Sequence, residues 1–240
     1  GRARGLRMSP AEPSRGAVAA VPISAVAITD GFWADRQEVN RAATLAHCLE
    51  WMERLGWVAN FDRAASMRAG AHAGREFADS EVYKLLEAMA WELGRRPDAE
   101  LERVFDSLAR RVLTAQADDG YLNTRFGGPG QPERYSDLEW GHELYCSGHL
   151  IQAAVARARV RGVDDPLVRG AVRLADHICR EFGAEARNGI DGHAEIETAL
   201  VELARVTGDH RYTRQAGLFV ERRGHGRLVS REVESAYFQD

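Results

Sequence analysis

Hydrophobic residues recur along most of this chain with the spacing of one face of an α-helix. The clearest series is Val82, Leu85, Leu86, Met89 and Leu93. These positions follow the i, i+3, i+4, i+7, i+11 pattern of an amphipathic helix, and Asp79-Ser80 can cap its start. A second series follows Pro97-Asp98, a pair that suits the first turn of a helix. Its members are Leu101, Val104, Phe105, Leu108 and Val112.

The same period predicts about seven helices and an all-α fold. The helices are expected over residues 35–56, 79–93, 97–112, 138–161, 166–182, 194–206 and 212–222. Only AVAAVPISAVAI (17–28) is strand-like. Because it follows several arginines, this segment also has the shape of a signal peptide. Pro22 and Ser24 interrupt its apolar run, which favours a short strand leading into the domain.

Two stretches of the chain repeat one design. LIQAAVARARVRG ends at Gly162, and IETALVELARVTG ends 46 positions later at Gly208. In both, a helix stops at glycine, a short polar turn follows, and a second helix returns. A period of this length predicts stacked helical hairpins, arranged either as an open solenoid or as a closed toroid.

Composition narrows the class of protein further. The chain has 240 residues and a net charge of −4, which gives no reason to expect nucleic-acid binding, because such binding calls for a basic face. No run reaches the roughly 18 apolar residues of a membrane span. Three widely spaced cysteines argue against a disulfide framework and indicate a reducing, cytoplasmic location. We expect one domain over residues 22–240, preceded by a disordered or non-native segment, 1–21. The oligomeric state stays open.

Polar residues gather in loops that precede helices. These loops are DDGYLNTRFGG (118–128), YSDLEWGHELYC (135–146) and NGIDGHAEIE (188–197). With one such loop per hairpin, all should emerge at the same end of the stack. Histidine, carboxylate and aromatic side chains beside the unpaired N–H groups of helix starts suit a small polar ligand with an apolar face, such as a sugar. A scaffold protein would place its recognition residues along a concave helical face instead.

The segment GHELYCSGHL (141–150) also invites a metal-site interpretation. It resembles the H-E-x-x-H zinc signature with a cysteine in place of the second histidine. On a helix, His142, Cys146 and His149 fall within about 60° of one another, as zinc ligands must. However, cysteine commonly packs as a small buried residue, and Gly148 indicates a close backbone approach. We therefore expect Cys146 and His149 to pack and predict no metal site here.

Five blocks of the chain match a known family in order and on the helix-pair period. They are FWADRQEVNR (32–41), DGYLNTRF (119–126), DLEWGHELYCSGHLIQAAVA (137–156), RLADHI (173–178) and GHAEIETALVELARVTGD (192–209). Over roughly residues 22–240 the chain resembles the N-terminal half of the glycoside hydrolase family 127 domain. The resemblance implies an (α/α)6 barrel that hydrolyses terminal β-L-arabinofuranosides with retention of configuration. It also implies a zinc-bound cysteine nucleophile and a glutamate acid/base.

The chain departs from the family pattern in the residues for catalysis. The family holds zinc with a glutamate-x-cysteine motif and a later adjacent cysteine pair, and this sequence has neither. Six hairpins of about 46 residues need roughly 276 residues, so seven helices do not close the ring. We therefore expect an incomplete, truncated (α/α)6 toroid that is inactive alone. Its catalytic residues, and the zinc of the complete enzyme, would lie after Asp240.

By the same resemblance, His142 and His193 contact the sugar substrate, which agrees with their place in the polar loops. Two nearby acids have two interpretations. Glu143 and Glu195 either orient these histidines or simply favour the dipole of the helices they begin.

The roles of other loop residues also stay open. Tyr121 and Asn123 either form part of a sugar platform or supply turn chemistry. Trp140 either stacks on a sugar ring or plugs the barrel, and Asp137 can cap the helix that follows. The alternative to a small-carbohydrate hydrolase is a non-catalytic helical-repeat binding protein.

Overall fold

The computed structural model of the protein describes residues 21–228 and 235–240, and within them every regular element is helical. Helices α1 (Gly31–Val39) and α2 (Leu45–Arg54) run on from each other through one π-helical stretch, Asn40–Thr44. The others are α3 (Trp57–Ala65), α4 (Ala78–Arg95), α5 (Ala99–Thr114), α6 (Glu143–Arg161), α7 (Pro166–Glu181), α8 (Ile196–Thr207) and α9 (His210–Arg222). Short 3-10 turns lie at Ile23–Ala25 and Ser235–Phe238. The prediction of an all-α fold is confirmed.

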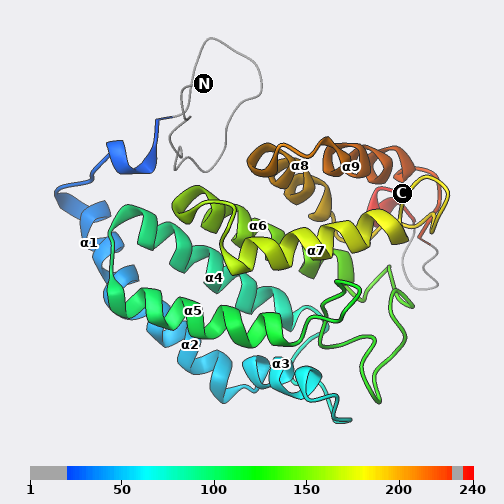
Figure 1. The fold of residues 1–240 in the computed structure, drawn as a ribbon, viewed down its shortest axis with the longest axis horizontal. Coiled ribbons are helices and arrows are strands. Elements are labelled where there is room, and N and C mark those ends of the chain that lie inside the picture. Colours follow the sequence, from blue (N-terminus) through cyan, green and yellow to red (C-terminus); the bar gives the residue numbers. More distant parts are fainter. Residues whose placement is uncertain (1–20, 229–234) are drawn as a thin grey trace.

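The helices form hairpins that stack in two layers (Figure 1). One layer holds α2, α4, α6 and α8, each packed on the next, and the second holds α3, α5, α7 and α9 in the same order. Each hairpin therefore contributes one helix to each layer. The stacked hairpins predicted from the 46-residue repeat are present.

Helix α6 lies in the middle of this stack and is buried along nearly its whole length. Its alanines at 153, 154, 156 and 158 are fully buried against the neighbouring helices. The closest approach is at Gly148, where an added Cβ would lie 2.7 Å from Cγ of Glu195 and 3.1 Å from the backbone nitrogen of Ile196. A larger residue at 148 would therefore displace the start of α8. The close approach that Gly148 indicated in the sequence is confirmed.

Two helix starts differ from the sequence prediction. Helix α3 was missed because Gly56, in the left-handed conformation with φ 78°, ends α2 and lets a new helix begin at once. Helix α6 starts at Glu143 and not near residue 138, because His142 has φ 58° and ψ 28°. The preceding residues form a separate turn, in which Asp137 accepts a hydrogen bond from the backbone N–H of Trp140 at 2.9 Å. Asp137 therefore caps this turn and not α6.

Two further expectations are wrong. Asp79 does not cap α4, which begins at Ala78; its buried carboxylate instead accepts the backbone N–H of Thr124 at 2.7 Å. The strand expected over residues 17–28 is not formed in its described part, 21–28, which contains only a 3-10 turn. No second strand is present among the described residues to pair with it. The segment 1–20 lies outside the described residues.

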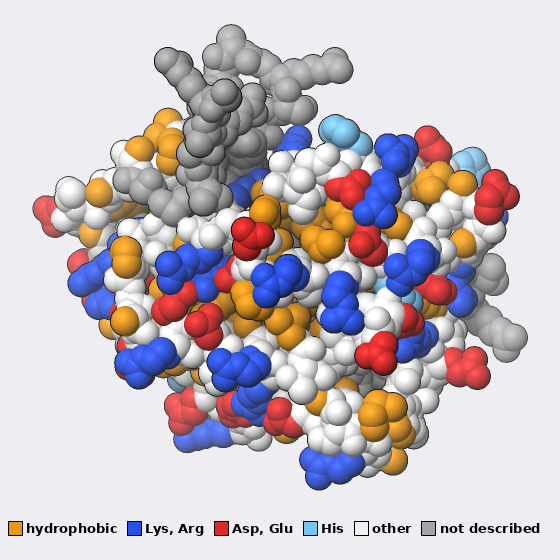
Figure 2. Space-filling model, viewed as in Figure 1, with side chains coloured by type: hydrophobic (Ala, Val, Ile, Leu, Met, Phe, Trp, Pro, Cys, Tyr) orange, Lys and Arg blue, Asp and Glu red, His pale blue; other side chains and the backbone are white. Residues whose placement is uncertain are grey.

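The outer layer presents a mixed polar surface. Over α5 and α7, basic and acidic side chains alternate with small apolar areas (Figure 2). Within residues 21–228 and 235–240, no helix combines the length and the apolarity that crossing a membrane demands.

Arg157 connects three helices through a buried charge network. Its side chain is 3% exposed and lies 4.2 Å from the ring centre of Phe105 on α5. Its guanidinium donates to Asp165 at 2.8 Å and pairs with Glu102. Because Asp165 also caps α7 through the N–H of Leu167, this network holds α5, α6 and the start of α7 together.

The substitution Arg157→Ala is expected to lower the free energy of unfolding by about 3 kcal/mol, because it leaves two carboxylates without their buried partner. Urea denaturation followed by circular dichroism measures this. Arg161→Ala is the matched control: Arg161 pairs with the same Glu102 but is exposed, so its loss should cost less than about 1 kcal/mol. Equal losses for the two variants would contradict a buried structural role for Arg157.

Candidate functional site

The loops that precede α4, α6 and α8 gather at one end of the two layers, on the right in Figure 1. His142 is the residue before α6, and His193 lies in the loop before α8. Their ring centres are 5.8 Å apart. The tertiary structure thus brings together the two histidines that the sequence singled out.

Tyr145, in the first turn of α6, lies among three imidazole rings. Its ring centre is 5.4 Å from that of His142, 4.4 Å from that of His193 and 4.5 Å from that of His149. We call these four residues the histidine–tyrosine cluster. Lys84 of α4 donates to the Tyr145 hydroxyl at 2.9 Å. The sequence prediction missed Tyr145, although its place one helical turn before His149 was a signal, as was Lys84 being the chain's only lysine.

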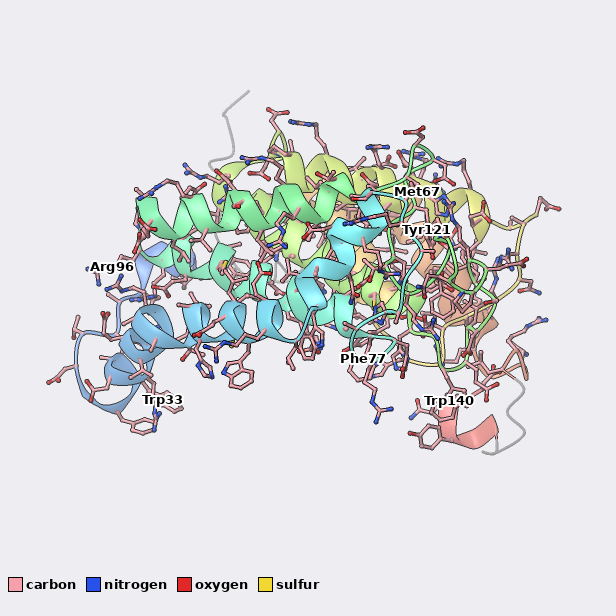
Figure 3. All side chains as sticks on the ribbon, turned by 90° about the horizontal axis from the view of Figure 1, so that it is seen from below. Trp33, Met67, Phe77, Arg96, Tyr121 and Trp140 are labelled. Carbon is pink, nitrogen blue, oxygen red and sulfur yellow. The ribbon has the colours of Figure 1, made fainter. Side chains whose placement is uncertain are left out.

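Aromatic side chains border the cluster. The ring of Phe77, just before α4, is 5.4 Å from that of His142. Phe77 and Trp140 project from the same side of the molecule, opposite α5 (Figure 3). Trp140 is 39% exposed, and its ring lies 5.2 Å from that of Phe238. Trp140 therefore has both a packing contact and an accessible surface.

His149 and Glu195 form an acid–base pair at the edge of the cluster. Nδ1 of His149 is 3.8 Å from Oε1 of Glu195. Burial, and then the charges of Lys84 and His193, lower the pKa of His149 to about 4. Burial, and then the nearby carboxylates of Glu87 and Glu197, raise the pKa of Glu195 to about 7. Near neutral pH, the imidazole is therefore uncharged and the carboxyl is close to half protonated. Glu195 approaches His149 and not His193.

Asp191 holds the two histidine loops in place. One oxygen of its carboxylate accepts the backbone N–H groups of Leu144 at 2.8 Å and Tyr145 at 3.2 Å, at the start of α6. The other oxygen accepts the N–H of His193 at 3.0 Å. Asp191 is 1% exposed, and burial raises its pKa to about 6, although these hydrogen bonds and the charge of His142 oppose the shift. One side chain from the loop before α8 thus caps α6.

The comparison with known proteins identifies the family. The model of the β-L-arabinofuranosidase GH127 catalytic domain matches residues 25–240 of the chain. The protein belongs to the GH127 family. It is therefore related to glycoside hydrolases.

Individual relatives in the GH127 family are longer than this chain. The non-reducing end β-L-arabinofuranosidase of Bifidobacterium longum subsp. longum is 38% identical over 173 residues, which make up 70% of this chain and 26% of that protein. The crystal structure of a GH127 β-L-arabinofuranosidase from Geobacillus stearothermophilus T6 matches with a TM-score of 0.79 and 36% identity, over 84% of this chain and 33% of that one. The GH127 β-arabinofuranosidase BT3674 matches with a TM-score of 0.82 and 30% identity, over 96% and 37%. The chain thus covers between 26% and 37% of the length of each of these relatives.

Within this GH127 chain, Glu143 and Tyr121 lie behind the cluster and not on its surface. Glu143 is 1% exposed and accepts hydrogen bonds from the Tyr121 hydroxyl and from the N–H of Tyr135, the latter at 2.6 Å. Tyr121 is also buried, inside the loop between α5 and α6 (Figure 3). Glu143 therefore orients neither histidine. The position of this pair suits holding the loop, because neither side chain has a surface to offer a ligand.

Asn123 has the contacts of a turn residue. Its side-chain oxygen accepts the backbone N–H groups of Arg125 at 2.8 Å and Phe126 at 3.0 Å, and the side chain is buried. This is the side-chain-to-backbone pattern of an Asx turn. Of the two interpretations left open for Asn123, the turn is the one with contacts in the structure.

Cys146 points away from the cluster into the core. It is buried in the packing of α6, and burial raises the pKa of its thiol well above the usual range. Across residues 21–228 and 235–240, no three or more histidine, cysteine, aspartate or glutamate side chains come close enough to hold a metal ion. The described residues therefore do not fit the zinc ion that the family resemblance implies, and we assign no step to zinc.

The buried carboxyl of Glu143 should make stability depend on pH. Burial raises its pKa to about 8, against the effect of the two hydrogen bonds it accepts, whereas the unfolded chain has the ordinary value near 4.3. The folded state therefore binds more protons than the unfolded state between about pH 4.5 and 8. Its stability must fall as the pH rises through this window, by at most about 1.4 kcal/mol per pH unit.

In the variant Glu143→Gln, this pH-dependent loss of stability should disappear. The amide can still accept a hydrogen bond from the backbone N–H of Tyr135 and donate one to the Tyr121 hydroxyl. Urea denaturation at a series of pH values should show the variant gaining stability relative to the wild type from pH 4.5 to 8, with no further gain above 8. Parallel pH profiles would show that Glu143 has an ordinary pKa.

Proposed function

We propose that the histidine–tyrosine cluster binds the terminal β-L-arabinofuranosyl group of a glycoside, and that the chain is the sugar-holding part of a β-L-arabinofuranosidase. The observation that carries this proposal is the meeting of His142 and His193, with ring centres 5.8 Å apart, at the end of the stack. Two matched relatives are named as β-L-arabinofuranosidases, which agrees with such a substrate.

The hydrogen bonds of the two histidines suit sugar hydroxyls. Nδ1 of His142 contacts the carbonyl of Trp140, and Nδ1 of His193 contacts the carbonyl of Ala194 at 3.1 Å. Because a carbonyl only accepts, both Nδ1 atoms must carry the proton. In the neutral rings each Nε2 then has a lone pair that can accept from a sugar hydroxyl.

Tyr145 and Phe77 supply the complementary contacts. The Tyr145 oxygen accepts from Lys84, so its own O–H can donate to a second sugar oxygen. Phe77 offers an aromatic face beside His142, and an aromatic ring packs well on the C–H groups of a sugar. Together these groups provide two acceptors, one donor and one apolar surface.

We further propose that the hairpins are part of an (α/α)6 ring, and that the 240 residues bind the sugar without hydrolysing it. The chain covers 33% and 37% of two matched relatives, and the described residues bring no metal ligands together. Within this scheme His142, His193 and Tyr145 hold the sugar ring.

His142→Ala and His193→Ala are each expected to weaken binding of methyl β-L-arabinofuranoside about tenfold, the equivalent of one hydrogen bond of roughly 1.4 kcal/mol. Isothermal titration calorimetry or ligand-observed NMR measures the affinity. His210→Ala is the control, because His210 is an exposed histidine at the start of α9. Unchanged affinity in both cluster variants would show that the sugar does not bind here.

The purified 240-residue protein is expected to release no arabinose from an aryl β-L-arabinofuranoside. Elemental analysis should find no stoichiometric zinc, and Cys146→Ser should leave the metal content as it is. Measurable turnover would show that the chain contains its own catalytic groups. One tightly held zinc per chain that is lost in Cys146→Ser would place a metal site in α6.

A further inference from the structure

A polar hollow lies in the loops that precede α4 and α6, near the histidine–tyrosine cluster. Its volume is about 540 Å³, and it is formed by residues 70–76 before α4 together with the loop around residues 125–131. Its polar lining consists of His72, Arg75, Glu76, Arg125 and Gln131, and small residues make up the rest. Glu76 is followed directly by Phe77, which packs on His142. The hollow therefore borders the proposed sugar site.

The hollow has an excess of positive charge. Within the described residues, neither Arg75 nor Arg125 has a carboxylate within ion-pair distance, although both line the same space as Glu76. The guanidinium of Arg125 is held by Gln131, to which it donates at 3.1 Å, and Gln131 in turn donates to the carbonyl of Gly70 at 2.6 Å. The two loops are thus joined across the hollow, which places Arg125 in a defined position.

Arg63 of α3 joins the two loops that form the hollow. It donates to the carbonyls of Gly70 at 3.0 Å and Thr124 at 2.8 Å, one in each loop. Burial, and the charge of Arg125, lower the pKa of Arg63, although Asp79 opposes the shift. An anion in the hollow would relieve the repulsion between these arginines.

His72 lines the hollow, but its Nε2 faces the buried Asp79. Its side chain is only 4% exposed, and Nε2 is buried without a hydrogen-bond partner. The nearest carboxylate is that of Asp79, at 3.9 Å, and both oxygens of Asp79 already accept from Thr124. His72 therefore shapes the wall of the hollow and is not a contact for a ligand in it.

We infer that this hollow binds the carboxylate of an acidic sugar, a hexuronic acid, to which the arabinofuranosyl group is attached. The inference rests on the proposed function, because the hollow borders the site of the arabinofuranosyl ring. Arg75 and Arg125 form charge-assisted hydrogen bonds with the carboxylate. Glu76 accepts a hydrogen bond from one ring hydroxyl, and the amide nitrogen of Gln131 donates one to another. A space of this volume is suited to a ligand of one or two sugar rings.

The test compares two arabinofuranosyl disaccharides, one with galacturonic acid and one with galactose as the second sugar. Calorimetry on the 240-residue protein at low salt should give at least about tenfold tighter binding of the acidic disaccharide, the effect of one charge-assisted hydrogen bond. Arg75→Gln and Arg125→Gln should each reduce this preference, because they weaken binding of the acidic disaccharide more than binding of the neutral one. Arg214→Gln, at an exposed position on α9, is the control and should keep the preference.

Each contrary outcome has a separate meaning. Equal affinity for the two disaccharides, or a preference that survives both arginine substitutions, overturns the acidic-sugar site and leaves the proposed function intact. Competition by inorganic phosphate as strong as that by galacturonate shows a general anion site and also overturns the inference. If neither disaccharide binds, the proposed function and the inference both fail.

Discussion

The hydrogen bonds of Asp191 are the interaction on which the site depends. A single buried carboxylate caps the start of α6 and holds the backbone of His193, so it joins two loops that are far apart in sequence. His142 adopts a left-handed conformation just before α6 and makes no side-chain cap there. Without Asp191, the first N–H groups of α6 would be buried and unpaired, which is costly. The spacing of His142 and His193 therefore follows from the requirement to cap a helix.

This arrangement stabilises the site, but it buries carboxyl groups, which has a cost in folding free energy. Burial raises the pKa of Asp191, Glu143 and Glu195 alike, so each carboxyl makes folding less favourable as the pH rises through its titration range. Asp191 and Glu143 offset part of this cost with hydrogen bonds from the backbone. Loops fixed in this way can present rigid side chains to a ligand, which reduces the entropy lost on binding.

The two layers explain why the site lies at one end. Each hairpin contributes a helix start to the same end of the stack, and small residues such as Gly148 let α6 and α8 approach closely there. The relatives in the GH127 family share this arrangement over most of the chain. The hollow lined by Arg75 and Arg125 also lies at this end, where Arg63 and Gln131 join the loops that form it.

The sequence by itself indicated the helical class, the hairpin repeat, the family and two histidines that meet at one end of the stack. Helical periodicity is a local property of the chain, and glycine stops such as Gly162 and Gly208 are read directly from it. Tertiary structure alone decided which loop residues meet. The sequence pattern indicated Tyr121 and Glu143 as site residues, but the two are buried against each other. Tyr145 and Asp191 were not predicted from the sequence. The physical reason is that a carboxylate or phenol has the same sequence pattern whether it faces solvent or the core. Only the packing of α4, α6 and α8 sets its direction.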